Sequence, residues 1–406
     1  MAEKQFDIII YGATSFVGQI VTQYMHDRYG DGAVGWAIAG RSQSKLEDVA
    51  RSVGLPDVEM IVADAADEVA LQQICARTKV VISTVGPYAL YGDILLKVCA
   101  ENGTHYCDLT GEPHWIRRMQ AAHEETAKDS GARIVHCCGF DSIPSDLGVH
   151  VLQDHAVKAL GEPCERIDMR VMRIKGGASG GTIASMVELV KEASGNAQLR
   201  RELKNPYSLC PPDHDFTVRQ RNVGAEEDKR LGKWITPFIM EAINTKVVHR
   251  SNALSGNSYG THFRYEEAMV TGRGTGGKRR AKLTALGLGA FTAGVAIPPI
   301  RWLLGKFLPK PGEGPSPTEQ REGMFDMLFL GSTASGKQAR VRVTGDRDPG
   351  YGSTAKMLSE AAACLAKDIG DDVPGGFWTP ATLMGDTLVA RLEANAGLTF
   401  EIVPEA

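Results

Sequence analysis

The chain has 406 residues, enough to bury a large core and to form two or more lobes. Charged residues make up 23% of it and the formal net charge is -4, so its electrostatics give no basis for binding nucleic acid. The eight cysteines are scattered without a Cys-x-x-Cys pair, which predicts reduced thiols, a cytoplasmic protein and no metal centre. A polar N-terminus runs straight into the first predicted strand, so we expect no signal peptide.

A glycine-bracketed turn follows the first predicted strand, Asp7–Tyr11, which is as apolar as a strand buried on both faces of a parallel sheet. An amphipathic helix over Gln19–Arg28 comes next. In such a turn the glycines permit a sharp bend and close helix–strand packing, while the helix start offers free N–H groups to a pyrophosphate. The pattern therefore predicts a dinucleotide-binding turn, with an ordinary strand–turn–helix as the alternative. The predicted turn consists of Gly12, Ala13, Thr14, Ser15, Phe16, Val17 and Gly18.

The end of the second predicted strand, Gly35–Ala39, indicates which dinucleotide binds. In this fold an acidic residue there binds a free ribose hydroxyl, whereas an arginine accommodates a 2′-phosphate. The sequence has no acid at this point but has Arg41, with the Ser42 hydroxyl beside it. NADP(H) is therefore favoured over NAD(H). The alternative is a solvated arginine at the start of a helix over Ser44–Val53.

Two further strand ends are expected at the same edge of the sheet. The strand Val58–Ala63 leads to Asp64, which either meets the adenine amino group or caps the helix Asp67–Arg77. The strand Val80–Thr84 ends in a turn of small residues, where a nicotinamide ribose would lie against backbone. The residues predicted for this contact are Thr84, Val85, Gly86 and Pro87.

Strands over His105–Leu109 and Arg133–Cys137 continue the alternation with helices and bring the predicted strands to six. We therefore predict an α/β fold: a Rossmann-type, doubly wound parallel sheet over residues 1–148. A second α/β domain with a mixed sheet is expected over 149–340. The C-terminal segment, 341–406, is expected to pack back on the first domain and close the cleft.

The second domain should begin with a strand over Arg166–Ile174, whose alternating residues predict one exposed face. A glycine-rich turn then precedes a helix over Ile183–Ser194, so Thr182 either helps to hold a substrate oxyanion or merely caps that helix. The same turn matches the Gly-x-Ser-x-Gly elbow of α/β-hydrolases around Ser179, a rival interpretation that leaves the N-terminal turn unexplained.

One apolar stretch, Leu283–Ile300, has no charged residue and just reaches the length of a membrane span. Its glycines and the pair Pro298-Pro299 argue against a spanning helix. The sequence leaves three interpretations open: a spanning helix, an element on a membrane surface or lining an acyl chain, and a plain buried helix.

The chain resembles the saccharopine-dehydrogenase-like oxidoreductases, and most of all their trans-acting enoyl reductase branch. This resemblance implies hydride transfer from NADPH to the β-carbon of an α,β-unsaturated acyl thioester, carried by a carrier protein in lipid or polyketide synthesis. The segments that carry it are Tyr11–Gly18, Ala39–Ser42, Ser83–Gly92, Tyr106–Glu112, Gly139–Gly148 and Gly375–Gly385.

Such a reaction needs hydrogen-bond donors at the thioester oxygen and an acid for the α-carbon. Positions at strand ends and glycine turns give four catalytic candidates, with capping or packing as the alternative role of each. The candidates are Tyr88, Asp141, Ser142 and Thr182. Two other functions stay open: a saccharopine-dehydrogenase-type amino-acid oxidoreductase, although no basic cluster for two carboxylates is evident, and a non-catalytic nucleotide-binding protein on membranes or lipid. Peripheral membrane contact and a homodimer also stay open.

Overall fold

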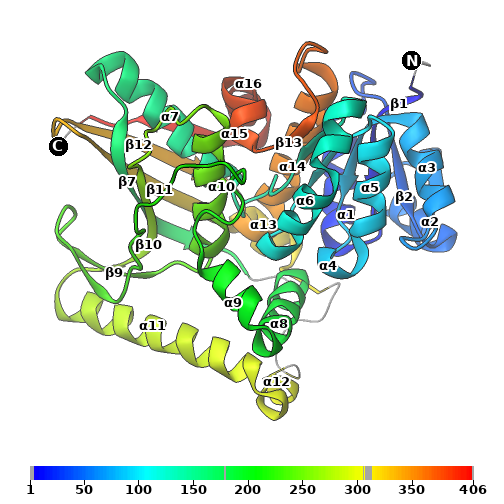
Figure 1. The fold of residues 1–406 in the computed structure, drawn as a ribbon. Coiled ribbons are helices and arrows are strands. Elements are labelled where there is room, and N and C mark those ends of the chain that lie inside the picture. Colours follow the sequence, from blue (N-terminus) through cyan, green and yellow to red (C-terminus); the bar gives the residue numbers. More distant parts are fainter. Residues whose placement is uncertain (1–3, 178–179, 305, 307–312, 405–406) are drawn as a thin grey trace.

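The described part of the protein has two lobes, and each lobe is built around one seven-stranded sheet (Figure 1). The computed structural model describes residues 4–177, 180–304, 306 and 313–404, with backbone alone at 182 and 183. The strand order is β13-β6-β5-β4-β1-β2-β3 in the first sheet and β14-β12-β11-β7-β10-β9-β8 in the second. The predicted α/β class, a doubly wound parallel sheet with a second mixed-sheet domain, is confirmed.

Every strand pair of the first sheet is parallel. Its strand β1, which pairs with β4 and β2, carries Ile8, Ile9 and Ile10, all fully buried. Ile8 and Ile10 pack in one hydrophobic cluster and Ile9 in another, because successive side chains point to opposite faces of a strand. The strands are β1 (Phe6–Tyr11), β2 (Trp36–Gly40), β3 (Met60–Val62), β4 (Thr78–Ser83), β5 (His105–Asp108), β6 (Arg133–Val135) and β13 (Gly376–Trp378).

Helices cover both faces of this sheet (Figure 1). Val21 and Met25 of the first helix join the cluster of Ile8, whereas Leu71 and Leu96 of two others join that of Ile9. The helices of the first lobe are α1 (Phe16–Tyr29), α2 (Gln43–Ser52), α3 (Glu68–Arg77), α4 (Tyr88–Tyr91), α5 (Asp93–Glu101), α6 (Pro113–Ser130), α7 (Ile143–Leu160) and α14 (Thr354–Lys367).

The second sheet is mixed: β7 and β10 run parallel, and the other pairs are antiparallel. Its strands are β7 (Cys164–Lys175), β8 (Glu226–Asp228), β9 (Lys233–Pro237), β10 (Arg264–Gly272), β11 (Met324–Thr333), β12 (Gln338–Gly345) and β14 (Leu398–Ile402). The remaining helices are α8 (Gly180–Gly195), α9 (Ala197–Lys204), α10 (Glu241–Leu254), α11 (Gly274–Ala296), α12 (Pro298–Leu304), α13 (Pro317–Glu322), α15 (Pro380–Leu383) and α16 (Gly385–Arg391), with single π-helical turns η1 (Pro349–Ser353) and η2 (Leu392–Ala396).

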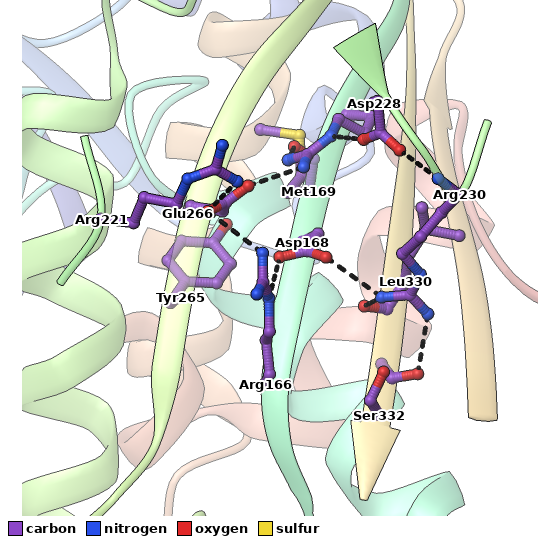
Figure 2. A network of polar contacts seen from close by, with 12 residues as sticks. Arg166, Asp168, Met169, Arg221, Asp228, Arg230, Tyr265, Glu266, Leu330 and Ser332 are labelled. Atoms are coloured by element: carbon purple, nitrogen blue, oxygen red, sulfur yellow. Dashed lines mark hydrogen bonds and ion pairs between the residues drawn. The ribbon is translucent and has the colours of Figure 1, made fainter. Parts of the chain in front are cut away.

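The polar face of β7 is covered rather than exposed, so that prediction was wrong. Asp168 and Arg170 are each only 2% exposed. Arg170 donates to Asp228 of β8 and to Glu266 of β10, both at 2.6 Å, while Arg166 donates to Asp168 at 2.7 Å. Figure 2 shows these charges interleaved across neighbouring strands. The alternation marks a strand correctly, but the face opposite the hydrophobic core is buried under an ionic network.

The C-terminal segment returns to both lobes. Its strand β13 pairs with β6, and α14 contributes Leu358 to the hydrophobic cluster beneath β1, whereas β14 pairs with β12 in the second sheet. The expected boundaries at 148 and 340 fall inside α7 and β12. Near the C-terminus the chain forms α15, α16 and η2 in succession, and Gly385, at the junction of α15 and α16, has a φ of +39°.

Helices α11 and α12 lie along the lower edge of the molecule in Figure 1. Among the residues that the structure describes, no single helix is long and apolar enough to cross a membrane. The pair formed by α11 and α12, bent by 114° at the break, meets the length and composition criteria together.

Candidate functional site

The turn between β1 and α1 has the geometry that its glycines predict. Gly12 has a φ of +90°, which favours glycine. A Cβ on Gly18 would overlap the carbonyl oxygen of Gly12 and lie 2.8 Å from the Cα of Ala13, so only glycine lets α1 start this close to the strand. The Ser15 side chain caps α1 by accepting from the Gly18 N–H at 2.9 Å. The cap leaves other N–H groups of the first turn free for an anion.

A Gly18→Ala variant should therefore lose dinucleotide affinity, since α1 must move away from the turn to admit the methyl group. Overpacking of this kind costs about 1–3 kcal/mol, so NADPH should bind roughly tenfold to a hundredfold more weakly in a fluorescence titration. Gly224→Ala is a control for glycine replacement as such, because the φ of Gly224 is not in the left-handed region and a Cβ there meets no atom within 4 Å. An unchanged affinity in Gly18→Ala would contradict the role of the turn.

The end of β2 brings Arg41 to the rim of a cavity, with an exposed side chain and no ion-pair partner among the described residues. Lys45 of α2 borders the same cavity. Ser42 is placed differently: it precedes α2, its hydroxyl lies 3.3 Å from that of Ser44, and it does not line the cavity. The Arg41 guanidinium has no internal ion pair to lose, and its contact with a 2′-phosphate stays a prediction.

Arg41→Ala should weaken NADPH binding about tenfold to a hundredfold, because a hydrogen bond to a charged group contributes about 1.5–3 kcal/mol. NADH lacks the 2′-phosphate, so its dissociation constant should change far less. Isothermal titration of both cofactors measures the ratio. An equal loss for NADPH and NADH would exclude the assigned role.

The ends of β3 and β4 complete this edge of the sheet. Asp64 accepts from the Ala66 N–H at 2.9 Å and lines the cavity, while Asp67 caps α3 by accepting from the Ala70 N–H. The Thr84 hydroxyl donates to the Gly12 carbonyl at 2.9 Å and lies 3.0 Å from the Ser15 hydroxyl. Thr84 thus ties the two turns together, and Val85, Gly86 and Pro87 continue the cavity wall.

The cavity has a volume of about 1990 Å³ and runs from the α1 turn into the second lobe. Its first-lobe wall is the carboxyl edge of the sheet, where open α/β sheets bind ligands. Its second-lobe wall comes from α8, α9, α10, α11 and the segment 216–222. Apolar side chains dominate that wall; they include Met186, Leu189, Phe216, Phe238, Ile239 and Leu288.

Asp141 is the predicted catalytic residue best placed for proton transfer. It follows β6, borders the cavity, and its carboxyl oxygens have no hydrogen-bond partner among the described residues. Burial, followed by the nearby charge of Asp108, raises the pKa of Asp141 to about 7. A carboxyl group that faces a ligand cavity and has a pKa near 7 can donate a proton and regain it near neutral pH.

Two further cavity residues were not found from the sequence. Burial raises the pKa of Glu241 to about 8, helped by Glu267 and Glu266, and burial lowers the pKa of Lys246 to about 8. The Lys246 ammonium donates to the carbonyls of Leu203 and Asn205 at 3.0 and 2.9 Å. Nothing local in the sequence of α10 marks either residue, because both shifts come from packing against other elements.

Tyr88 borders the cavity, but its hydroxyl is buried and donates to the Ser83 carbonyl at 2.8 Å. Burial raises the pKa of Tyr88 well above its usual value. Its N–H and that of Ala89 donate to Glu112, each at 2.9 Å, and Ser185 of α8 donates to the same carboxylate at 2.7 Å. Glu112 therefore joins the second lobe to the turn after β4.

The structure describes the side chain of only one of the other two catalytic candidates. Ser142 is fully buried, donates to Asn244 at 3.0 Å and does not line the cavity. Thr182 lies in the first turn of α8, beside Gly181 on the cavity wall, but its side chain lies outside the described residues. Ser179, on which the hydrolase interpretation depended, also lies outside them.

The residues at the carboxyl edge fit a bound NADP(H). Gly12 and Gly18, neither of which has room for a Cβ, form the turn at the start of α1 where a pyrophosphate would lie. The guanidinium of Arg41, which has no ion-pair partner among the described residues, lies at the end of β2. The Phe16 ring packs against Tyr351 at 4.6 Å between centroids, so the C-terminal segment closes over the same turn. Asp141 lines the same cavity as these dinucleotide-binding residues.

Comparison with known proteins agrees with this site. The model of the saccharopine dehydrogenase NADP-binding domain matches residues 8–135, which cover the turn, Arg41 and Thr84. Among solved structures, saccharopine dehydrogenase (L-Glu forming) from Saccharomyces cerevisiae has a TM-score of 0.55 at 11% identity, covering 98% of this chain and 100% of that one. At that identity the likeness shows the fold alone. The fold and the site define an NADP-dependent oxidoreductase.

Relatives of similar length give the family. A Mycobacterium tuberculosis protein provisionally named a trans-acting enoyl reductase is 40% identical over 98% of this chain and 97% of its own. The trans-acting enoyl reductase of Mycobacterium ulcerans is 36% identical over 96% of both chains. The chain belongs to the trans-acting enoyl reductase family, and the resemblance seen in its motifs is confirmed.

Proposed function

We propose that the protein reduces the carbon–carbon double bond of an α,β-unsaturated acyl thioester with NADPH. This proposal rests on one observation: the residues that fit a dinucleotide and Asp141 line the same cavity. The carboxyl group of Asp141 has a pKa of about 7 and no hydrogen bond to a described residue. The names of the relatives support the reaction class.

When bound, NADPH supplies the hydride that reaches the β-carbon. Negative charge then develops at the thioester oxygen, and a proton must reach the α-carbon. Below pH 7 Asp141 is protonated and can deliver that proton from the cavity wall. Backbone N–H groups at the start of α8, beside Gly181, are donors on the opposite lobe for the thioester oxygen.

The second-lobe wall suits a long acyl chain. Met186 and Leu189 of α8 and Leu288 of α11 offer apolar surface on this wall. The volume of about 1990 Å³ is larger than a typical small-molecule site, so it accommodates a cofactor together with an extended substrate. This supports a substrate that is carried on a phosphopantetheine arm by an acyl carrier protein.

The test is consumption of NADPH with enoyl thioesters of increasing chain length. We expect turnover that improves with length as more of the apolar wall is filled. Saccharopine is the competing substrate to test. Lys246 already binds two carbonyl oxygens and Arg221 pairs with Glu226 and Glu266, and we expect enoyl thioesters to be preferred. Turnover of an amino-acid substrate with none of any enoyl thioester would favour the saccharopine-dehydrogenase alternative.

We place this activity in the cytoplasm. All eight cysteines are free thiols, as expected in a reducing compartment, which supports this location. A homodimer remains a prediction, and sedimentation velocity of the purified protein would decide it.

A further inference from the structure

Helices α11 and α12, residues 274–304, form an arm that is scarcely covered by the rest of the protein. Of the 23 residues of α11, the buried ones are Gly277, Ala281, Gly294 and Val295, and none of α12 is buried. Figure 1 shows the arm outside both sheets, running along the lower edge of the second lobe. A helix of a soluble protein ordinarily buries an apolar stripe, so this degree of exposure needs a reason.

Large apolar side chains lie on the surface of the arm. Leu286 is 70% exposed and Trp302 is 67% exposed. Isolated exposed apolar residues are normal, but a concentration along one element marks an interaction site. The exposed large apolar residues of the arm are Leu283, Leu286, Ile297, Ile300, Trp302 and Leu303.

The charge of the arm is opposite to that of the protein. The formal net charge of the chain is -4, yet residues 273–306 contain no aspartate or glutamate. The basic residues in this range are Arg273, Lys278, Arg279, Arg280, Lys282, Arg301 and Lys306. Arg279 and Lys282 are exposed and have no ion pair or hydrogen bond through their side chains to any described residue. The arm is therefore a cationic, apolar surface on an acidic protein.

The arrangement of the basic residues decides how such a surface would meet a bilayer. Lys278, Arg279, Arg280 and Lys282 lie in the first turns of α11, so the uncharged remainder of this helix, 283–296, has about 14 residues and is about 21 Å long at 1.5 Å per residue. That is shorter than the hydrocarbon core of about 30 Å. The chain then bends by 114° into α12. The arm suits a position along the surface of a membrane, with its cations among the headgroups.

We propose that the arm binds the surface of a bilayer containing anionic lipids. Anionic headgroups complement the unpaired cations, and Trp302 is a residue type that favours the membrane interface. A second copy of the chain would bring the same positive charges against one another. An acidic carrier protein would form ion pairs with the basic residues but would not cover the exposed apolar side chains of both helices.

If the protein has the function proposed above, the position of the arm decides from which side a long-chain substrate enters the cavity. Leu288 and Thr292 of α11 line the cavity, within two turns of exposed Leu286. An arm lying in the headgroup layer would therefore place the apolar wall of the cavity beside the acyl chains of the bilayer. Long-chain thioesters would reach Asp141 from the membrane side, whereas short soluble ones would not need the membrane.

The test is co-sedimentation of the full chain with vesicles of phosphatidylglycerol and phosphatidylcholine, compared with vesicles of phosphatidylcholine alone. Arg279→Gln/Lys282→Gln should weaken binding to anionic vesicles roughly thirtyfold, since each basic residue near a membrane contributes about fivefold. Leu286→Ser/Trp302→Ser should weaken it at least tenfold. The matched control, Arg51→Gln/Val69→Ser, removes one exposed cation and one exposed apolar residue from α2 and α3 and should bind as the wild type does.

Three results would overturn the proposal: equal binding to both kinds of vesicle, wild-type binding by the arm variants, or an equal loss in the control. Loss of a concentration-dependent dimer in Leu286→Ser/Trp302→Ser, without vesicle binding by the wild type, would also overturn it in favour of a second copy. NADPH consumption with a short, soluble enoyl thioester should be unchanged in the arm variants. That readout separates failure of the membrane site from failure of the proposed reaction.

Discussion

Replacing Asp141 by asparagine is expected to slow reduction of an enoyl thioester by about 10²–10⁴-fold, the usual contribution of a positioned general acid. The amide keeps the shape of the side chain but cannot give up a proton to the α-carbon. Because the pKa of Asp141 is about 7, kcat/KM of the wild type should fall as the pH rises above 7. The residual activity of Asp141→Asn should lack that decline. Steady-state rates between pH 5.5 and about 9 measure both effects.

Stability provides the control for this variant. The pKa of Asp141 is raised above its unfolded value of 3.8, so the native state holds a proton that the unfolded chain releases between these two pH values. Its contribution to stability is fully present below pH 3.8 and is lost as the pH rises through 7. At pH 8 Asp141→Asn should therefore melt no lower than the wild type. A lower melting temperature together with the lost activity would point to misfolding rather than to a missing acid.

The second large effect is expected at Arg170. Its guanidinium is 2% exposed and donates to Asp228 and Glu266, both also buried. Arg170→Met removes the cation but leaves the two carboxylates without their shared partner. Breaking a buried ion pair in this way costs about 3–5 kcal/mol. Urea unfolding monitored by circular dichroism should show this loss in the free energy of unfolding.

A matched ion pair lies on the same sheet. Arg342 donates to both carboxyl oxygens of Asp326, at 2.9 and 2.7 Å, but its side chain is 48% exposed. Arg342→Met should therefore cost less than Arg170→Met, because it leaves one buried carboxylate, Asp326, without its partner rather than two. If Arg170→Met and Arg342→Met cost the same, the buried network in Figure 2 does not stabilise the second lobe as inferred.

The first lobe could be predicted because its signals are local. A glycine with φ of +90° at Gly12, a close contact at Gly18 and an arginine at a strand end each follow from a few neighbouring residues. The edge that binds NADP(H) is then fixed by topology, since parallel strands bring their carboxyl ends together. The position of Asp141 on the cavity wall follows for the same reason, because it comes after a strand of that sheet, while its catalytic role stays a prediction.

The second lobe could not be predicted in the same detail, because its features depend on partners far along the chain. The alternation in β7 is visible in the sequence, but the carboxylate of Glu266 that buries Arg170 lies 96 residues away. Glu241 and Lys246 acquire their shifted pKa values from packing that no local pattern records. The return of β13 to the first sheet is a tertiary pairing of three residues, too short to give a signal of its own.

The central claim is that one cavity brings NADPH and an enoyl thioester together for hydride transfer. Its most direct test uses NADPH deuterated at the transferable position and a long-chain enoyl thioester, with mass spectrometry of the product. The account predicts one deuterium at the β-carbon and a solvent proton at the α-carbon. NADPH that binds at Arg41 but leaves the thioester unreduced and unlabelled would contradict it.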